Sequence, residues 1–148
     1  MLKRVLVAAA VAALTAAPAM ADHVCGAAPV APAVPGASDI AGKTPDEAHK
    51  IAGDAFKLVK IYQSALQPFY NCVEQQVIKN KKDMADAKDK RDQAKIAAIE
   101  VAATDLDKDY QGTVGTEKQV VADYMSLHEN YCKMGPDLVG CVVPKPAY

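Results

Sequence analysis

The chain has 148 residues, with 17 basic and 18 acidic side chains and a formal net charge of −1 at pH 7. This balance excludes general nucleic-acid binding and a polybasic membrane-binding surface, since both need clustered positive charge. Alanine is abundant, tryptophan is absent and aromatic residues make up only 5% of the chain. Contacts between alanines bury little apolar area, which stabilises by roughly 25 cal/mol per Å², so we expect a thin core that gains from cross-links.

Residues 1–21 have the pattern of a secretory signal peptide. Lys3 and Arg4 precede a short apolar run, and the Ala-Met-Ala at 19–21 fits a small-residue cleavage site. The run is shorter than the ~20 residues that cross a bilayer, and no later segment is apolar enough to do so. We therefore expect an exported protein, periplasmic or secreted, whose mature chain starts at Asp22 and has no transmembrane segment.

An arm over residues 22–43 follows the signal. It carries Pro29, Pro32 and Pro35 among alanines and glycines, without the periodicity of a helix or a strand. This composition is typical of an extended, partly polyproline spacer. The remaining residues, 44–148, are expected to form one helical bundle with a C-terminal tail.

The best-defined helix is expected from Thr44 to Lys79. Thr44 can cap it, Pro45 suits the first helical position and Glu47 completes a capping box. Pro68 predicts a kink one turn before it. Spacings that alternate between four and three residues place one apolar stripe on this helix, formed by Ile51, Ala55, Leu58, Tyr62, Ala65, Phe69 and Cys72.

A second helix is expected to begin at Asp83. From Phe69 to Gln111 the chain has neither glycine nor proline, so composition alone does not exclude one very long helix. The apolar stripe is lost among Lys and Asp side chains, however, which favours a turn at 80–82. The stripe of the second helix then consists of Ile96, Ile99, Ala103, Leu106 and Tyr110.

A third helix is expected from Thr116 to the Gly-Pro at 135–136. The Gly-Thr-Val-Gly at 112–115 is the clearest turn signal in the chain, and Thr116 after it is a suitable N-cap. The stripe of this helix consists of Val120, Tyr124, Leu127, Tyr131 and Met134. The sequence therefore predicts an all-α fold, a three-helix up-down-up bundle with an extended Pro/Ala-rich N-terminal arm, stapled by two disulfides.

Four cysteines in an exported chain indicate two disulfides: Cys25, Cys72, Cys132 and Cys141. At 1.5 Å of rise per residue, the up-down-up arrangement brings Cys132 within about one turn of Cys72. We therefore predict Cys72–Cys132 and Cys25–Cys141. The pairing Cys25–Cys72 with Cys132–Cys141 stays open as the alternative, because connectivity cannot be ranked from sequence alone.

No motif predicts catalysis or a cofactor. The chain has no Gly-x-Ser-x-Gly elbow, no phosphate-binding glycine loop and no His-Glu-x-x-His, so we predict no enzyme, no catalytic residue and no metal site. His128 and Cys132 have the i, i+4 spacing of a metal-binding pair, but that use needs a reduced cysteine. In an exported protein, a histidine packed beside a disulfide is the favoured interpretation.

The charged run from Lys79 to Lys95 is the most unusual surface feature. Its signs nearly cancel, which is typical of a solvated helix face. The other interpretation is a contact surface, because apolar side chains beside the run lose cover from the second helix and the lysines would form a polar rim. The predicted partner-binding residues are Lys81, Lys82, Lys88, Val73 and Val77.

Together these features predict an exported, non-catalytic helical protein of the bacterial envelope that acts by binding. The expected partner is an envelope protein or a surface polymer, and self-association is open as well. A periplasmic protein that binds a small ligand or a metal is the alternative, and a small enzyme ranks last.

Overall fold

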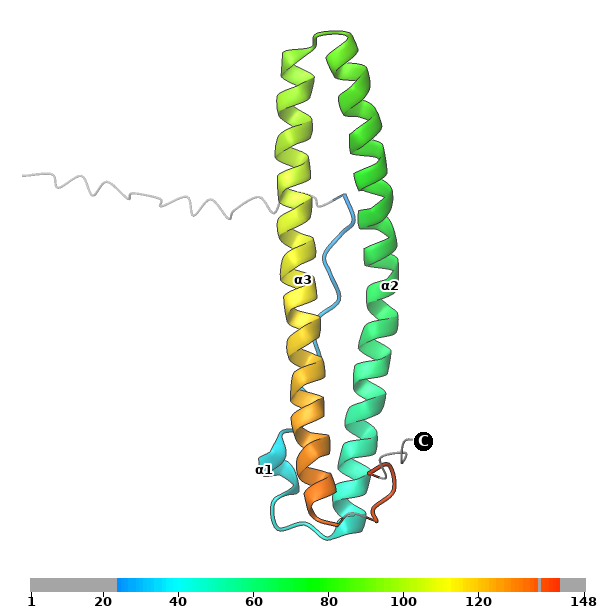
Figure 1. Cartoon of the computed structure of the whole chain (residues 1–148), viewed down its shortest axis with the longest axis vertical. Helices are drawn as coiled ribbons and strands as arrows, with labels where there is room; N and C mark the ends of the chain where they lie inside the picture. Colours follow the sequence, from blue (N-terminus) through cyan, green and yellow to red (C-terminus); the bar gives the residue numbers. More distant parts are fainter. Residues whose placement is uncertain (1–23, 136, 142–148) are drawn as a thin grey trace, which may run out of the picture.

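The computed structural model describes residues 24–135 and 137–141; the expected signal peptide lies outside them. This part of the chain forms three helices, α1 (Ala37–Ile40), α2 (Pro45–Asp89) and α3 (Gln93–Lys133), and no strand. The helices α2 and α3 lie side by side and antiparallel, with the turn that joins them at one end and α1 at the other (Figure 1). None of these helices combines the length and the apolar character that crossing a membrane requires.

The expected start of the long helix α2 is confirmed. The hydroxyl of Thr44 accepts the backbone N–H of Glu47 at 3.3 Å, and the Glu47 carboxylate accepts the backbone N–H of Thr44 at 2.9 Å. Pro45 occupies the first helical position. These bonds satisfy N–H groups that have no partner inside the helix. The helix then runs through Pro68 and ends far beyond Lys79, at Asp89.

The turn between α2 and α3 lies at Lys90–Asp92, so the predicted turn at 80–82 is wrong. The N–H of Asp92 donates to the carbonyl of Ala87 at 2.9 Å, and that of Arg91 to the carbonyl of Lys88 at 3.0 Å. With Arg91 at φ 57°, this is a Schellman termination. The side chain of Asp92 then caps α3 by accepting the N–H of Lys95 at 3.0 Å.

The predicted turn at 112–115 is also wrong, because these residues lie inside α3. Thr113 is buried and its hydroxyl donates to the carbonyl of Asp109 at 2.8 Å. The hydroxyl of Thr116 donates to the carbonyl of Gly112 at 2.9 Å and does not cap a helix. The physical reason is that the apolar stripes of the expected second and third helices lie on the same face of one continuous helix. Thr113 lies on that face between Tyr110 and Val120 and connects them. Both turns needed for an up-down-up arrangement therefore fall within helices.

The apolar stripe of α2 follows the predicted spacing but lies beside the predicted positions. It agrees at Ala55, Tyr62 and Phe69, whereas Leu58 is 39% exposed and Ala65 is exposed as well. The difference arises because α3 packs on the neighbouring strip of the helix surface, which has the same alternation of four and three. The buried positions of this strip are Ala48, Ala52, Ala55, Val59, Tyr62, Leu66, Phe69 and Val73.

Two buried clusters fill the half of the hairpin nearer α1. The first comprises Ile40, Ala48, Ala52, Ala55, Leu127 and Tyr131, and the second comprises Val59, Tyr62, Leu66 and Val120. The arm packs against these clusters through Ala31 and Val34 as it runs along the two long helices (Figure 1). The arm is free of helix up to Gly36, as expected, but α1 interrupts the segment predicted to be extended up to residue 43.

The two disulfides are Cys25–Cys72 and Cys132–Cys141, with Cα–Cα distances of 5.6 and 5.3 Å. The predicted pairing is therefore wrong and the alternative is found. The cause is the position of the turn: the aromatic rings of Tyr70 and Tyr110 lie 5.8 Å apart across the hairpin. Cys72 thus lies near the level of residue 110, far along α3 from Cys132, and it joins the arm instead.

Candidate functional site

A ladder of side-chain contacts joins α2 and α3 at intervals of seven residues. The contacting atoms or ring centroids lie between 2.9 and 5.8 Å apart. Seven residues make two turns of a helix in a coiled-coil contact, so the rungs follow one edge of the hairpin. The rungs of this cross-helix ladder are His49–Tyr131, Phe56–Tyr124, Gln63–Glu117 and Tyr70–Tyr110.

One rung of the ladder is a polar network around Glu117. Its carboxylate accepts the hydroxyl of Tyr70 at 2.7 Å and the side-chain amide of Gln63 at 3.1 Å. Burial and this hydrogen bond to Glu117 raise the pKa of Tyr70 well above its ordinary value. Burial also raises the pKa of Tyr62, with the charge of Glu117 as a smaller cause. A partly buried polar network between two packed helices helps to fix their register.

The ladder ends at Tyr70–Tyr110, where a cavity opens between α2 and α3. The next rung in the same register would join Val77 to Ala103, and both residues line the cavity. Its volume is about 910 Å³. It is lined by Tyr70, Val73, Glu74, Val77, Ile78, Asn80, Lys81, Met84, Ile99, Ala103, Leu106, Asp107 and Tyr110.

The cavity lies in the turn-proximal part of the hairpin, which we define as residues 73–109. Neither buried cluster reaches this part, and the described arm begins at the level of its attachment to Cys72. The stripe of α2 continues here with Gln76, Asn80 and Asp83, which are only partly buried. Polar side chains at these positions contribute little apolar contact between the two helices, and Asn80 lines the cavity.

The structure brings together three of the five residues predicted to bind a partner. Val73, Val77 and Lys81 line the cavity, with Val73 buried and Val77 40% exposed. Lys82 and Lys88 are exposed but do not line it. The α3 wall was missed by sequence reasoning, which assigned its stripe residues Ile99, Leu106 and Tyr110 to a bundle core. On α2, the apolar side chain of Ile78 next to Val77 indicates a wider apolar surface, and the prediction did not include it.

Charges of both signs border the cavity. Asp107 accepts a long hydrogen bond of 3.5 Å from the side chain of Gln111. Glu74 and Lys81 form no hydrogen bond or ion pair with any other residue of the described ranges. The neighbouring Lys79, by contrast, pairs with Asp83 at 2.5 Å. Two charges at the rim are therefore available to a binding partner.

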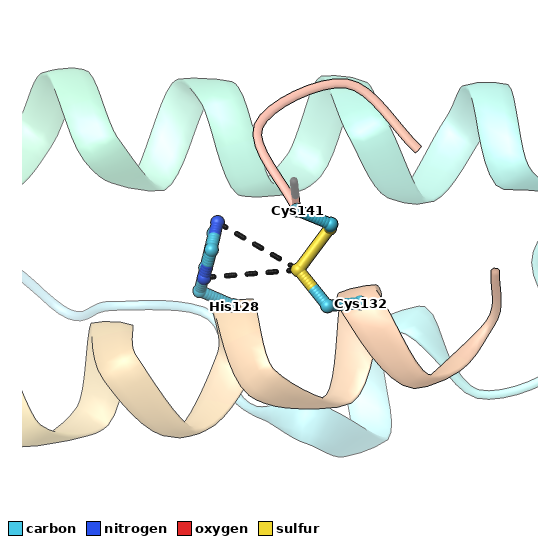
Figure 2. A group of neighbouring side chains, drawn as sticks. All are labelled: His128, Cys132 and Cys141. Atoms are coloured by element: carbon cyan, nitrogen blue, oxygen red, sulfur yellow. Dashed lines mark hydrogen bonds between the residues drawn. A yellow bond between two sulfur atoms is a disulfide. The ribbon is translucent and has the colours of Figure 1, made fainter. Parts of the chain in front are cut away.

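Figure 2 shows a second group of side chains, His128, Cys132 and Cys141. His128 and Cys132 lie near the C-terminal end of α3, at the end of the hairpin away from the cavity. Both ring nitrogens of His128 lie 3.9 Å from the sulfur of Cys132, which is bonded to Cys141 at 2.02 Å. The ring of His128 also packs beside Tyr124, at 5.8 Å between centroids. Metal binding by cysteine uses the thiolate, and both sulfurs here are held in the disulfide. The arrangement matches the expected histidine beside a disulfide.

Comparison with models of known protein families, with curated proteins and with solved structures finds no match for this chain.

Proposed function

We propose that this protein is an exported, non-catalytic component of the bacterial envelope that acts by binding another protein chain. The binding surface is the cavity between α2 and α3 in the turn-proximal part. The observation that carries this proposal is an open, mainly apolar cavity of about 910 Å³ in the part of the hairpin that the described arm does not cover. Apolar surface of this kind is typical of protein-interaction sites.

The lining indicates the chemistry of the partner. Val77, Ile78 and Leu106 offer apolar contacts, while Glu74, Lys81 and Asp107 provide charges of both signs at the rim. An apolar centre with a polar rim is the usual construction of a protein interface. An apolar cavity between two helices suits an amphipathic helix, which buries its own stripe there. We therefore propose a helical segment as the bound element.

Export is supported by two features of the chain. The first residues have the pattern of a signal peptide, and two disulfides link the described residues. Disulfides form and persist in oxidising compartments. These features are compatible with a periplasmic or extracellular location, and we propose the periplasm or the secreted fraction.

The test places a photo-crosslinkable residue at Val77 in the full chain, expressed in a bacterial host. The matched control places it at Val101, which is 63% exposed on α3 and does not line the cavity. We expect a cross-linked protein peptide from position 77, identified by mass spectrometry and predicted to form an amphipathic helix, and none from position 101. Equal cross-linking from both positions would contradict the proposal.

Two substitutions refine this test. V77D places a charge on the wall of the cavity and should abolish the cross-linked product formed by a reporter at Ile78. The triple variant K81E/K82E/K88E should weaken it, and because only Lys81 lines the cavity, K81E alone should account for most of the loss. Helicity measured by circular dichroism should stay unchanged in both. Cross-linking that persists in both variants would mean that the charged run is only a solvated face.

A small apolar ligand is the second candidate occupant, because the volume falls in the range of about 300 to 1,000 Å³ that is typical of small-molecule sites. An apolar fluorescent dye added to the purified protein tests it. Dye binding that saturates at one molecule per chain and is lost in V77D would favour this reading over a protein partner.

A further inference from the structure

We propose that the partner bound at the cavity is a second copy of this chain, docked antiparallel so that the two copies of α2 face each other. This inference rests on the proposed function of the cavity as a protein-binding surface. It names the occupant and the geometry, and both follow from the order of charged and apolar residues along one face of α2.

Four cavity-lining residues of α2 form that face: Glu74, Val77, Ile78 and Lys81. Their spacings of three, four and seven residues bring them to one side of a helix. Val77 is 40% and Ile78 55% exposed, so an apolar pair at the centre is open to contact. An acid precedes this pair by one turn and a base follows it by one turn.

This order is self-complementary under two-fold symmetry. If the symmetry axis passes between Val77 and Ile78, antiparallel α2 helices bring Glu74 of one copy opposite Lys81 of the other, twice per dimer. The apolar pairs then meet at the centre. Such an interface is isologous, because the same surface patch serves on both copies. A parallel alignment would place Glu74 against Glu74, so the charges favour the antiparallel one.

Within the described residues, no hydrogen bond or ion pair competes for the charges that would form these pairs. Neither Glu74 nor Lys81 makes a hydrogen bond or ion pair with the rest of the described residues, although Lys79 and Asp83 between and beside them pair with each other. Docking would therefore create two new ion pairs per dimer without breaking existing ones. It would also cover the apolar α3 wall, including Ile99 and Leu106, and so give the turn-proximal parts the layered packing of a four-helix bundle.

The experiment measures self-association of the mature protein by sedimentation equilibrium, for the parent, E74K, K81E and an equimolar mixture of the two variants. The parent should dimerise in the micromolar range. Each variant alone brings like charges together and should weaken dimerisation by about tenfold or more. One variant carries two lysines at the rim and the other two glutamates, so the mixture should recover association as a heterodimer.

K82E is the matched control, because it changes the net charge as K81E does but lies outside the cavity, and it should dimerise like the parent. A parent that stays monomeric throughout the micromolar range would overturn the inference. Dimerisation that is insensitive to both E74K and K81E, or a mixture that does not recover, would overturn it as well. Cross-linking from position 77 to a different envelope protein, with a monomeric parent, would overturn this inference while leaving the proposed function intact.

Discussion

Two glycines inside α3 provide a direct test of the hairpin. Gly112 and Gly115 are exposed and have no positive φ, and apart from its chain neighbours and the local helix backbone, a Cβ built on either meets no atom within 4 Å. Glycine inside a helix is less favourable than alanine by roughly 0.5 to 1 kcal/mol. The double variant G112A/G115A should therefore unfold with a free energy about 1 to 2 kcal/mol higher than that of the parent, which raises the Tm by several degrees Celsius.

The control for this prediction is Gly42, between α1 and α2. It also has open space at the Cβ position, but its φ is +72°. An L-residue in that conformation costs about 1 to 2 kcal/mol, so G42A should be destabilised although nothing obstructs its methyl group. Urea unfolding followed by circular dichroism at 222 nm measures all three proteins. If G112A/G115A loses stability as G42A does, residues 112–115 form a turn and the continuous α3 is wrong.

Further predictions concern the cross-links, the turn and the tyrosine network. Peptide mapping without reduction should recover Cys25–Cys72 and Cys132–Cys141; any peptide joining Cys72 to Cys132 contradicts the hairpin. In the chain-entropy model, replacing the first pair by serine should cost about 4 kcal/mol and the second about 2.5 kcal/mol, because their loops differ in length; equal losses of urea stability would show that loop length is not the cause. R91G should stabilise the protein by about 1 kcal/mol, because glycine adopts the positive φ of residue 91 without the strain of a Cβ. An unchanged urea midpoint would show that Arg91 is not strained. The folded pKa of Tyr70 is raised above the ordinary value of 10.0. The contribution of Tyr70 to stability is therefore complete below pH 10 and is lost as the pH rises through the folded pKa. Y70F should accordingly reduce the fall in Tm at alkaline pH.

The sequence predicted the helical class and the start of α2 because each has a local cause, and it predicted two disulfides from the even number of cysteines in an exported chain. The capping box at Thr44 needs only residues within one turn. The turn at Lys90–Asp92 could not be found in the same way, because the residue with positive φ is Arg91 and carries no glycine signal. The polar residues Asn80 and Asp83 occupy positions of the α2 stripe, so the sequence shows a break in the apolar pattern where the helix continues.

The periodicity of the sequence contradicts the predicted turn at Gly112–Gly115. The stripe continues from Tyr110 through Thr113 to Val120 in one phase, and a true turn would have shifted that phase. Composition outweighed periodicity in the prediction. The disulfide pairing is wrong because it depends on the predicted turns, which set the position of Cys132 along the helices relative to Cys72. The α2 side of the cavity could be anticipated from exposed apolar residues beside charges, whereas its α3 wall depends on a pairing of helices that only the fold supplies.

The course of the two disulfides has a consequence for how the chain can come apart. Cys25–Cys72 joins the arm to α2, and Cys132–Cys141 joins the tail to α3, so neither bond links α2 to α3. A single proteolytic cut after Arg91 would therefore yield two fragments, each cross-linked within itself, that separate on a denaturing gel without any reductant. For the same reason the covalent structure does not oppose domain swapping, in which the turn straightens and the α3 unit of one molecule packs on the α2 unit of another.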